Sequence, residues 1–259
     1  MKPFYKRLFY VSLFVCIFLG VAIISLSNAT FRRSTQTPNI YFTATPAGTP
    51  LLQSDKYLKD TSLLAKNVSC SAPCFRGITP GRTTFADALT KIKADPAFSN
   101  VQSQDPKKNL RGSADWSTKD GLNCCQLAST TDGVVSAMLI KVAPNMTAQQ
   151  MINNFGTPKF VNPVEYSDKD VAIAMVYPVQ GLVVWCYPGD VNSKLVANSP
   201  VIMLMFFDPG NWESIEDTST LQGWNGFLPY KTYRNATPIV TPKAPTTVPT
   251  TTPTLSTSG

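Results

Sequence analysis

Histidine is absent from this sequence of 259 residues, and charged residues make up only 15% of it. Without an imidazole the chain lacks the commonest general base, the usual activator of a catalytic serine or cysteine, and the most versatile metal ligand. It also contains neither a Gly-x-Ser-x-Gly elbow nor a phosphate-binding loop. These absences predict that the protein has no catalytic residues, no cofactor and no metal site, and that it is not an enzyme.

Acidic residues are missing from the first 50 positions, although the whole chain has 16 of them. From Leu51 onward, 18 basic residues stand against the 16 acidic residues, so this part carries only +2 of the net charge of +7. The basic excess therefore belongs to the N-terminus, where it suits anionic lipid and membrane topology. Because no basic stripe is interleaved with aromatic residues, we expect no nucleic-acid partner.

The apolar run Leu8–Leu26 holds 19 residues without a charge. A helix of that length crosses the hydrocarbon core of a bilayer, so residues 1–29 are predicted to be a signal anchor. The protein would then be a single-pass protein of the cell membrane, held through residues 8–26, with the bulk of the chain extracytoplasmic. The small residues Ser27-Asn28-Ala29 leave a second outcome open, in which cleavage after Ala29 yields a secreted protein.

Stretches rich in threonine and proline flank the region that can fold. Residues 30–66 are predicted to be an extended linker, with room for one short helix between residues 51 and 66. Residues 234–259 are predicted to be a disordered tail, because so little apolar surface cannot offset the entropy lost on ordering. The folded part is therefore expected within residues 67–233.

In the folded part, the same sequence pattern of a capped helix followed by strand-like runs occurs twice. Thr84 and Thr147 each have a capping partner three residues later, which is the spacing of a helix N-cap, and apolar residues then recur at helical spacing. Gly156-Thr157-Pro158 stops the second helix. Each helix is followed by strand-like runs, so residues 67–143 and 144–233 are predicted to be two repeats of one helix-plus-antiparallel-meander unit.

Five runs have the composition of strands: 122–130, 133–142, 171–177, 182–187 and 201–207. Asp132-Gly133 joins the first two as a two-residue hairpin turn. The run Val201–Phe207 is entirely apolar, which predicts either a central strand covered on both faces or a strand covered by a partner. Since neither repeat could bury its sheet alone, we expect an α+β domain with one continuous antiparallel sheet and both helices on one face.

Two motifs carry a resemblance to known proteins: Gly77-Ile-Thr-Pro-Gly81-Arg-Thr-Thr84, and Met146-Thr147-Ala-Gln-Gln-Met-Ile-Asn-Asn-Phe155-Gly156-Thr-Pro158. With the strands that follow, they resemble the modules of the small lipoprotein of the outer-membrane barrel-assembly machinery and of the tandem β-lactamase inhibitor protein. Cys70-x-x-x-Cys74-Phe-Arg-Gly77-Ile also resembles a motif of uncharacterised bacterial surface proteins. The chain departs from these modules by lacking a lipobox and by lacking a Gly-x-Pro stop after its first helix. The resemblance implies non-catalytic protein binding, typically through the exposed face of the sheet.

The part predicted to be exported has five cysteines: Cys70, Cys74, Cys124, Cys125 and Cys186. At most two disulfides can form, and exported thiols are usually oxidised rather than bound to zinc. Cys70 with Cys74 is the candidate disulfide, and a bridge from either of them to Cys124 or Cys125 is the alternative. Because neighbours on a strand point to opposite faces, Cys124 and Cys125 are not expected to share a partner. Cys186 is predicted to be a buried small hydrophobe.

Carboxylates gather at 165–170 and at 213–217, without the pattern of a calcium loop and without a second carboxylate at a separation suited to a glycosidase. Solvated turns account for both groups. Trp185 lies in a strand-like run and Trp116 precedes one, and both are predicted to fill the core. Trp212 and Trp224 lie in segments rich in Gly, Pro and Asn, and are the candidate binding surface.

The sequence thus predicts a membrane-anchored extracytoplasmic protein that binds another macromolecule, a protein or a glycan, at the cell surface. The expected mechanism is surface complementarity without covalent chemistry. The alternative is a structural envelope or spacer protein, suggested by the two tethers rich in threonine and proline. A hydrolase based on carboxylates ranks third.

Overall fold

The computed structural model describes residues 52–65 and 69–240. The predicted membrane segment, the linker up to residue 51 and the tail from residue 241 lie outside these ranges. Within them, the helices are all too short or too polar to cross a membrane.

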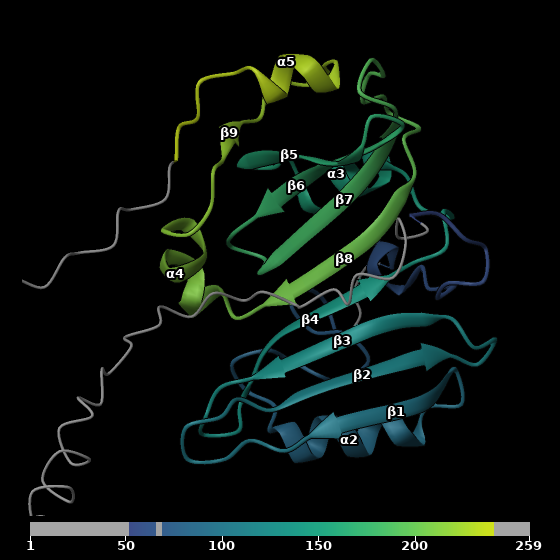
Figure 1. Cartoon of the computed structure of the whole chain (residues 1–259), viewed down its shortest axis with the longest axis vertical. Helices are drawn as coiled ribbons and strands as arrows, with labels where there is room; N and C mark the ends of the chain where they lie inside the picture. The colour runs from purple at the N-terminus through teal and green to yellow at the C-terminus, as the bar shows by residue number, and fades with distance from the viewer. Residues whose placement is uncertain (1–51, 66–68, 241–259) are drawn as a thin grey trace, which may run out of the picture. The chain divides into compact units, whose positions relative to one another are not determined.

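The described chain has an α+β fold in which a nine-stranded antiparallel sheet dominates and helices are few (Figure 1). The strands stand in the order β1-β2-β3-β4-β8-β7-β6-β5-β9. Their bounds are β1 Phe98–Gln104, β2 Ser113–Thr118, β3 Asn123–Ser129, β4 Val135–Lys141, β5 Phe160–Ser167, β6 Asp170–Tyr177, β7 Leu182–Gly189, β8 Val201–Phe207 and β9 Gln222–Gly223.

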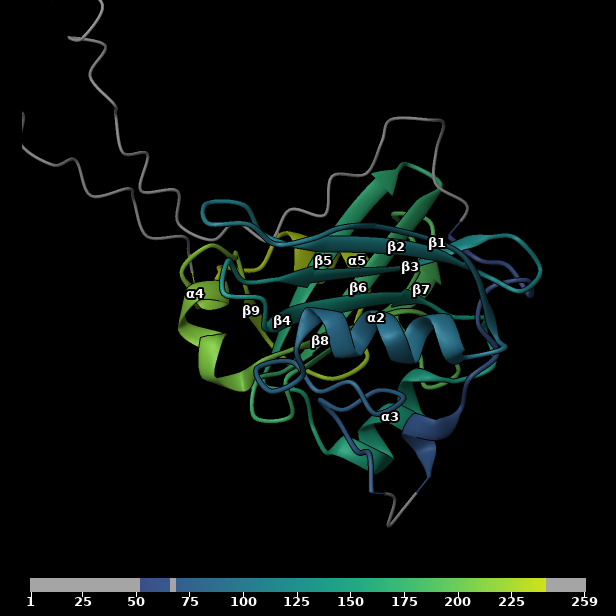
Figure 2. The same ribbon diagram turned by 90° about the horizontal axis from the view of Figure 1, so that it is seen from below.

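The described helices are short, and two of them cover the same side of the sheet. The α-helices are α2 (Phe85–Ala94), α3 (Ala148–Phe155), α4 (Trp212–Glu216) and α5 (Tyr230–Arg234), and the 3-10 helices are η1 (Ser62–Leu64) and η2 (Pro209–Asn211). Figures 1 and 2 show α2 and α3 on one side of the strands. We call the sheet face toward α2 and α3 the inner face, and the opposite face the outer face.

The two longer helices form where the capping residues predict. The Thr84 side chain accepts a hydrogen bond from the backbone N–H of Asp87 at the start of α2. At α3, Thr147 and Gln150 make both bonds of a capping box. The apolar stripe of α2 is buried, with Ile92 only 2% exposed, so this helix is held by packing as well as by its cap.

The core divides into two clusters, one on each face. Side chains of α2 and α3 pack in the larger cluster with alternate residues of the strands, such as Ile173 and Met175 of β6. The intervening residues Ala174 and Val176 belong to a smaller cluster on the outer face. Ile215 of α4 packs against this second cluster. The expectation of both repeat helices on one face therefore holds for α2 and α3, and α4 is an additional short helix on the outer face.

The prediction of a central strand at Val201–Phe207 is confirmed. This segment is β8, the fifth of the nine strands, and it pairs with β4 on one side and β7 on the other. Val201, Phe206 and Phe207 are fully buried. A strand of this composition is stable only when both faces are largely covered, which fixes it at the middle of the sheet.

Four strands were not predicted from the sequence: β1, β2, β5 and the two-residue β9. Strand β1 has the sequence Phe-Ser-Asn-Val-Gln-Ser-Gln and lies at one edge, where it is mostly exposed. Polar residues suit such a position because only one side pairs and little is buried. Strand β5 contains Pro163, which argues against a central strand, and its outer neighbour β9 pairs only with Phe160 and Val161.

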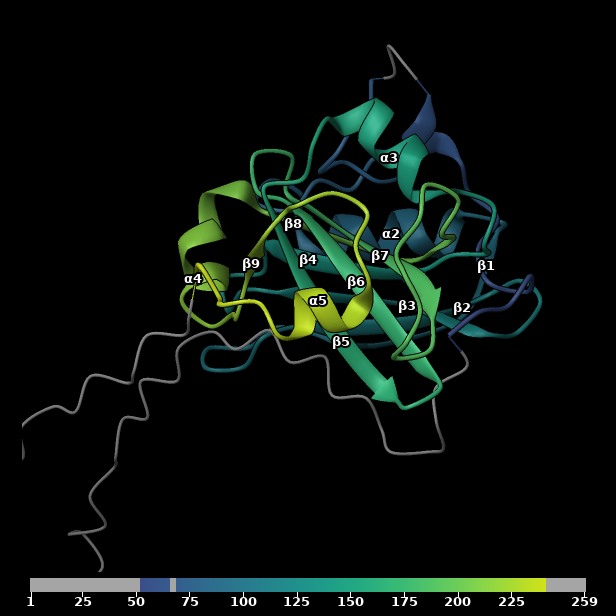
Figure 3. The same cartoon turned by 90° about the horizontal axis from the view of Figure 1, so that it is seen from above.

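The ends of the folded part are tied to the sheet. At one end Leu58 pairs with Val142, next to the 3-10 turn η1, which is the short helix expected between residues 51 and 66. At the other end Val240 pairs with Leu221. The folded part therefore continues past residue 233, where the sequence analysis expected it to end. Helix α5 lies beside β5 (Figure 3), where Arg234 forms an ion pair with Glu165.

The turn at Pro80-Gly81 needs its glycine. Gly81 has a φ of +81°, and a Cβ there would lie 2.5 Å from the carboxyl carbon of Asp208. The N–H of Gly81 also donates to Val135 O at 2.8 Å. The turn that precedes α2 therefore lies directly against the end of β8 and the start of β4.

Candidate binding surface

The outer face carries a patch of large apolar side chains where β4, β8 and β7 meet. Leu139 lies opposite Met205, and Met203 lies opposite Trp185. All four side chains are half-buried, and we call them the outer-face patch. Leu139 and Met203 belong to neither core cluster. Cross-strand neighbours of this kind form one continuous surface, so the patch is a single apolar area in the middle of the sheet.

Polar residues flank the patch on the same face. Gln126 of β3 lies opposite Leu139, and Lys141 of β4 lies opposite Met203. Burial lowers the pKa of Lys141, because the sheet shields the ammonium group from water and this disfavours its charged form. An apolar centre with a polar rim is the common anatomy of a protein-binding surface.

The structure places Trp212 beside this patch. Trp212 begins α4 and is half-buried, with its ring stacked on Phe160 at 5.6 Å and tilted against Phe207 at 6.0 Å between centroids. It packs against the outer cluster, as Trp185 does. One of the two predicted surface tryptophans therefore borders the outer face as part of an aromatic stack.

Trp224 lies in a different environment. Its ring contacts Phe227 and Tyr233 at centroid distances of 5.7 and 6.3 Å, and this group packs against the inner cluster. The structure therefore does not bring Trp212 and Trp224 into one surface. Trp116, at 1% exposure, is core as predicted, whereas Trp185, also predicted to be core, is half-buried on the outer face.

The cysteines form two local disulfides. Cys70 bonds to Cys74, which confirms the candidate pair. Cys124 bonds to Cys125, a pairing that the sequence analysis did not consider, and neither of them bonds to Cys70 or Cys74. The register between β2 and β3 shifts at this point, since Trp116 pairs with Cys125 and Ser117 with Asn123. Such a bulge interrupts the regular alternation of side chains along the strand at Cys124 and Cys125.

Cys186 is a free thiol and is fully buried in the inner cluster, as predicted. Burial raises the pKa of this thiol well above its usual value. It is therefore a packing residue and not a reactive group.

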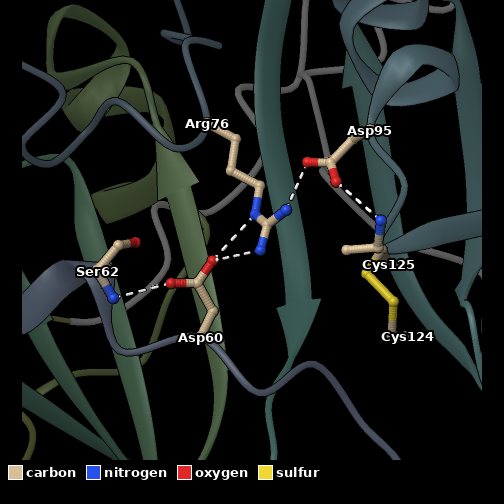
Figure 4. A network of polar contacts seen from close by, with 7 residues as sticks. Asp60, Ser62, Arg76, Asp95, Cys124 and Cys125 are labelled. Atoms are coloured by element: carbon tan, nitrogen blue, oxygen red, sulfur yellow. Dashed lines mark hydrogen bonds and ion pairs between the residues drawn. A yellow bond between two sulfur atoms is a disulfide. The ribbon is translucent and has the colours of Figure 1, made fainter.

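An ion-pair network joins three separated segments on the side of the molecule that holds α2 (Figure 4). Arg76 binds Asp60, 2.9 Å away, and also binds Asp95 at the end of α2. Its guanidinium lies 5.1 Å from the centre of the Phe98 ring. Burial alone would raise the pKa of Asp60, but hydrogen bonds from Ser62 and the Arg76 charge outweigh it and lower that pKa.

The carboxylates weighed as metal or acid–base groups have other partners. Asp170 accepts hydrogen bonds from Ser167 and Tyr187, and Glu165 is paired with Arg234. Glu213 lies exposed on α4. Among the described residues no three ligating side chains gather in the geometry of a metal site.

Sequence reasoning missed all four patch residues, since Trp185 was expected in the core. A signal was present in β8, where Met203 and Met205 alternate with Ile202, Leu204 and Phe206. Methionine at every second position marks the face that is less tightly packed, because this flexible side chain suits adaptable contacts.

Comparisons with known proteins add little to this account. No family model and no curated protein matches the chain. Among solved structures, the chain is similar to a DUF4309 family protein (YjgB) from Bacillus subtilis, with 12% identity and a TM-score of 0.27. The match covers 51% of this chain and 84% of that one.

Proposed function

We propose that this chain is a membrane-anchored extracytoplasmic binding module that holds another exported protein against the outer face of its sheet, without catalysis. The observation that carries the proposal is the outer-face patch of Leu139, Trp185, Met203 and Met205, half-buried at the centre of the sheet. Large apolar side chains grouped in this way are costly to leave in water and mark contact sites.

A protein is the partner favoured by the chemistry of the patch. Tryptophan and methionine are enriched in protein interfaces, and methionine adapts its shape to a partner. The patch spans three adjacent strands, which is broader than a site for a single small group. A glycan, the other partner class, would need polar groups around a stacking ring.

The patch lies where two halves of the sheet meet, and we infer that these halves are repeats. Helix α2 precedes β1 to β4, and α3 precedes β5 to β8. Thr84 and Thr147 cap the two helices in the same way. Leu139 comes from the first half and the other three patch residues from the second, so the surface exists only in the joined pair.

The two disulfides support an extracytoplasmic location, because disulfides persist in oxidising compartments. The long apolar run Leu8–Leu26 supports a membrane anchor.

Affinity capture with matched variants tests the proposal. Full-length protein with Met203→Arg and with Val179→Arg is compared with wild type after cross-linking in native membranes. Val179 is the matched control, because it is an apolar residue that is 83% exposed at the turn between β6 and β7. We expect a discrete partner that Met203→Arg loses and Val179→Arg keeps, with both variants unfolding at temperatures close to wild type.

Equal capture by both folded variants would contradict the proposal. Loss of cell-envelope integrity without any captured protein would instead favour the structural spacer. Turnover of glycan or peptide substrates that Glu213→Gln abolishes would favour the hydrolase.

A further inference from the structure

A cavity of about 120 Å³ lies between α4 and the sheet on the outer face. Ser136 of β4 and Phe207 of β8 line the side toward the sheet, and Ser214 and Ile215 line the side toward α4. At roughly 30 Å³ per water molecule, the space equals that of about four waters. It is large enough for a polar head group on a short aliphatic tail.

Arg111 supplies a positive charge to this cavity. The residue lies two positions before the start of β2 and is exposed. None of the ion pairs among the described residues involves its guanidinium. A guanidinium has five N–H donors in a planar fork that matches a carboxylate, so this side chain is available to hold an anion.

The other polar groups divide into donors and acceptors. The hydroxyls of Thr130 and Ser136 donate to backbone carbonyls of Val134 and Ala128, so toward the cavity they can only accept. Asn211 uses one side-chain N–H on Asp208 and keeps a second. The donors near Arg111 are therefore the Asn211 amide and the Ser214 hydroxyl.

The apolar lining lies beside these donors. Phe207 is fully buried, and Ile215 is half-buried on α4. A ligand that uses the whole cavity therefore has an anionic end and an apolar end.

The geometry points to a binding site for the carboxylate of a short aliphatic acid, with the carboxylate on Arg111 and the tail against Phe207 and Ile215. A free acid and the side chain of a glutamate in a bound protein share this chemistry. The inference rests on the cavity itself and does not require the outer-face patch to be an interface.

An NMR titration of the full-length, 15N-labelled protein in neutral detergent tests the site. The probes are butyrate, its neutral isostere butyramide, and N-acetylglutamate amide, with the backbone amides of Ser136 and Ser214 as reporters. We expect butyrate to cause saturable shifts at millimolar concentration and butyramide to cause none. Arg111→Gln is expected to weaken butyrate binding about tenfold, since it removes a charge-assisted bond.

Lys107→Gln is the matched control, because Lys107 lies in the same loop and outside the cavity lining. This variant is expected to bind butyrate like wild type. Tighter binding of N-acetylglutamate amide than of butyrate assigns the site to a glutamate side chain, and the reverse assigns it to a free acid. Equal binding of butyramide, unchanged binding in Arg111→Gln, or no saturable shift would overturn the proposal, whatever the result of partner capture.

Discussion

At the residue scale, Arg76 is a side chain that holds separate segments of the chain together through its ion pairs. It connects the N-terminal segment through Asp60 with the end of α2 through Asp95. The side chain of Asp60 is only 9% exposed, so removing its partner leaves a charge with little water around it. Such a group is costly unless it is paired.

We predict that Arg76→Gln lowers the free energy of unfolding by roughly 1–3 kcal/mol, the usual cost of leaving a buried polar group unsatisfied. Urea titrations followed by tryptophan fluorescence measure the change. Lys93→Gln, also near the end of α2 but exposed, is the control and should stay within about 0.5 kcal/mol of wild type.

The same network predicts a pH dependence. The pKa of Asp60 is lowered in the folded state, so its contribution is complete above the unfolded value of about 3.9 and is lost as the pH falls through the folded pKa. Urea titrations across acidic pH should show wild-type stability falling and Arg76→Gln falling less. Parallel slopes for the two proteins would show that the ion pair does not set the Asp60 pKa.

The buried thiol gives a second prediction at this scale. Because burial raises the pKa of Cys186, we expect iodoacetamide to leave it unmodified in the native protein and to label it after unfolding without reductant. Peptide mass spectrometry reads the label. Labelling of Cys124 or Cys125 in that unreduced sample would contradict the disulfide between them.

At the scale of elements, the two capped helices and the strongly apolar strands were predictable, whereas β1, β2, β5 and β9 were not. Helix α3 has a capping box and a glycine stop in its sequence, and β6 and β8 are apolar enough to be recognised. Strands β1 and β5 are held by pairing at the periphery, where composition hardly matters. Local sequence therefore specifies the elements that must be buried and leaves open those that tertiary pairing completes.

The capping box of α3 carries a prediction at this scale. Thr147→Ala is expected to cost about 1 kcal/mol of folding free energy, because the backbone N–H of Gln150 loses its acceptor, the Thr147 hydroxyl. Thermal and urea unfolding measure it. Thr90→Ala, which removes an exposed threonine inside α2, is the control. An equal loss of folding free energy in both variants would show that the Thr147 cap does not stabilise α3.

At the scale of the whole molecule, the pairing of β4 with β8 joins a four-stranded half and a five-stranded half into one sheet. The sequence predicted this union because neither repeat could bury its sheet alone. It did not predict the outer-face patch, because which face stays open depends on where α4 and β9 pack. Trp212 shows the difficulty, since its Gly- and Pro-rich surroundings indicated a surface while the fold stacks it on Phe160.

The central claim is that the outer-face patch contacts a protein partner. Site-specific photo-cross-linking in native membranes tests it most directly, with p-benzoylphenylalanine placed at Met203 in one variant and at the exposed Val179 in another. The account predicts one discrete protein adduct from position 203 and none of the same mass from position 179. The same adduct from both positions, or none from position 203 in a folded protein, would contradict it.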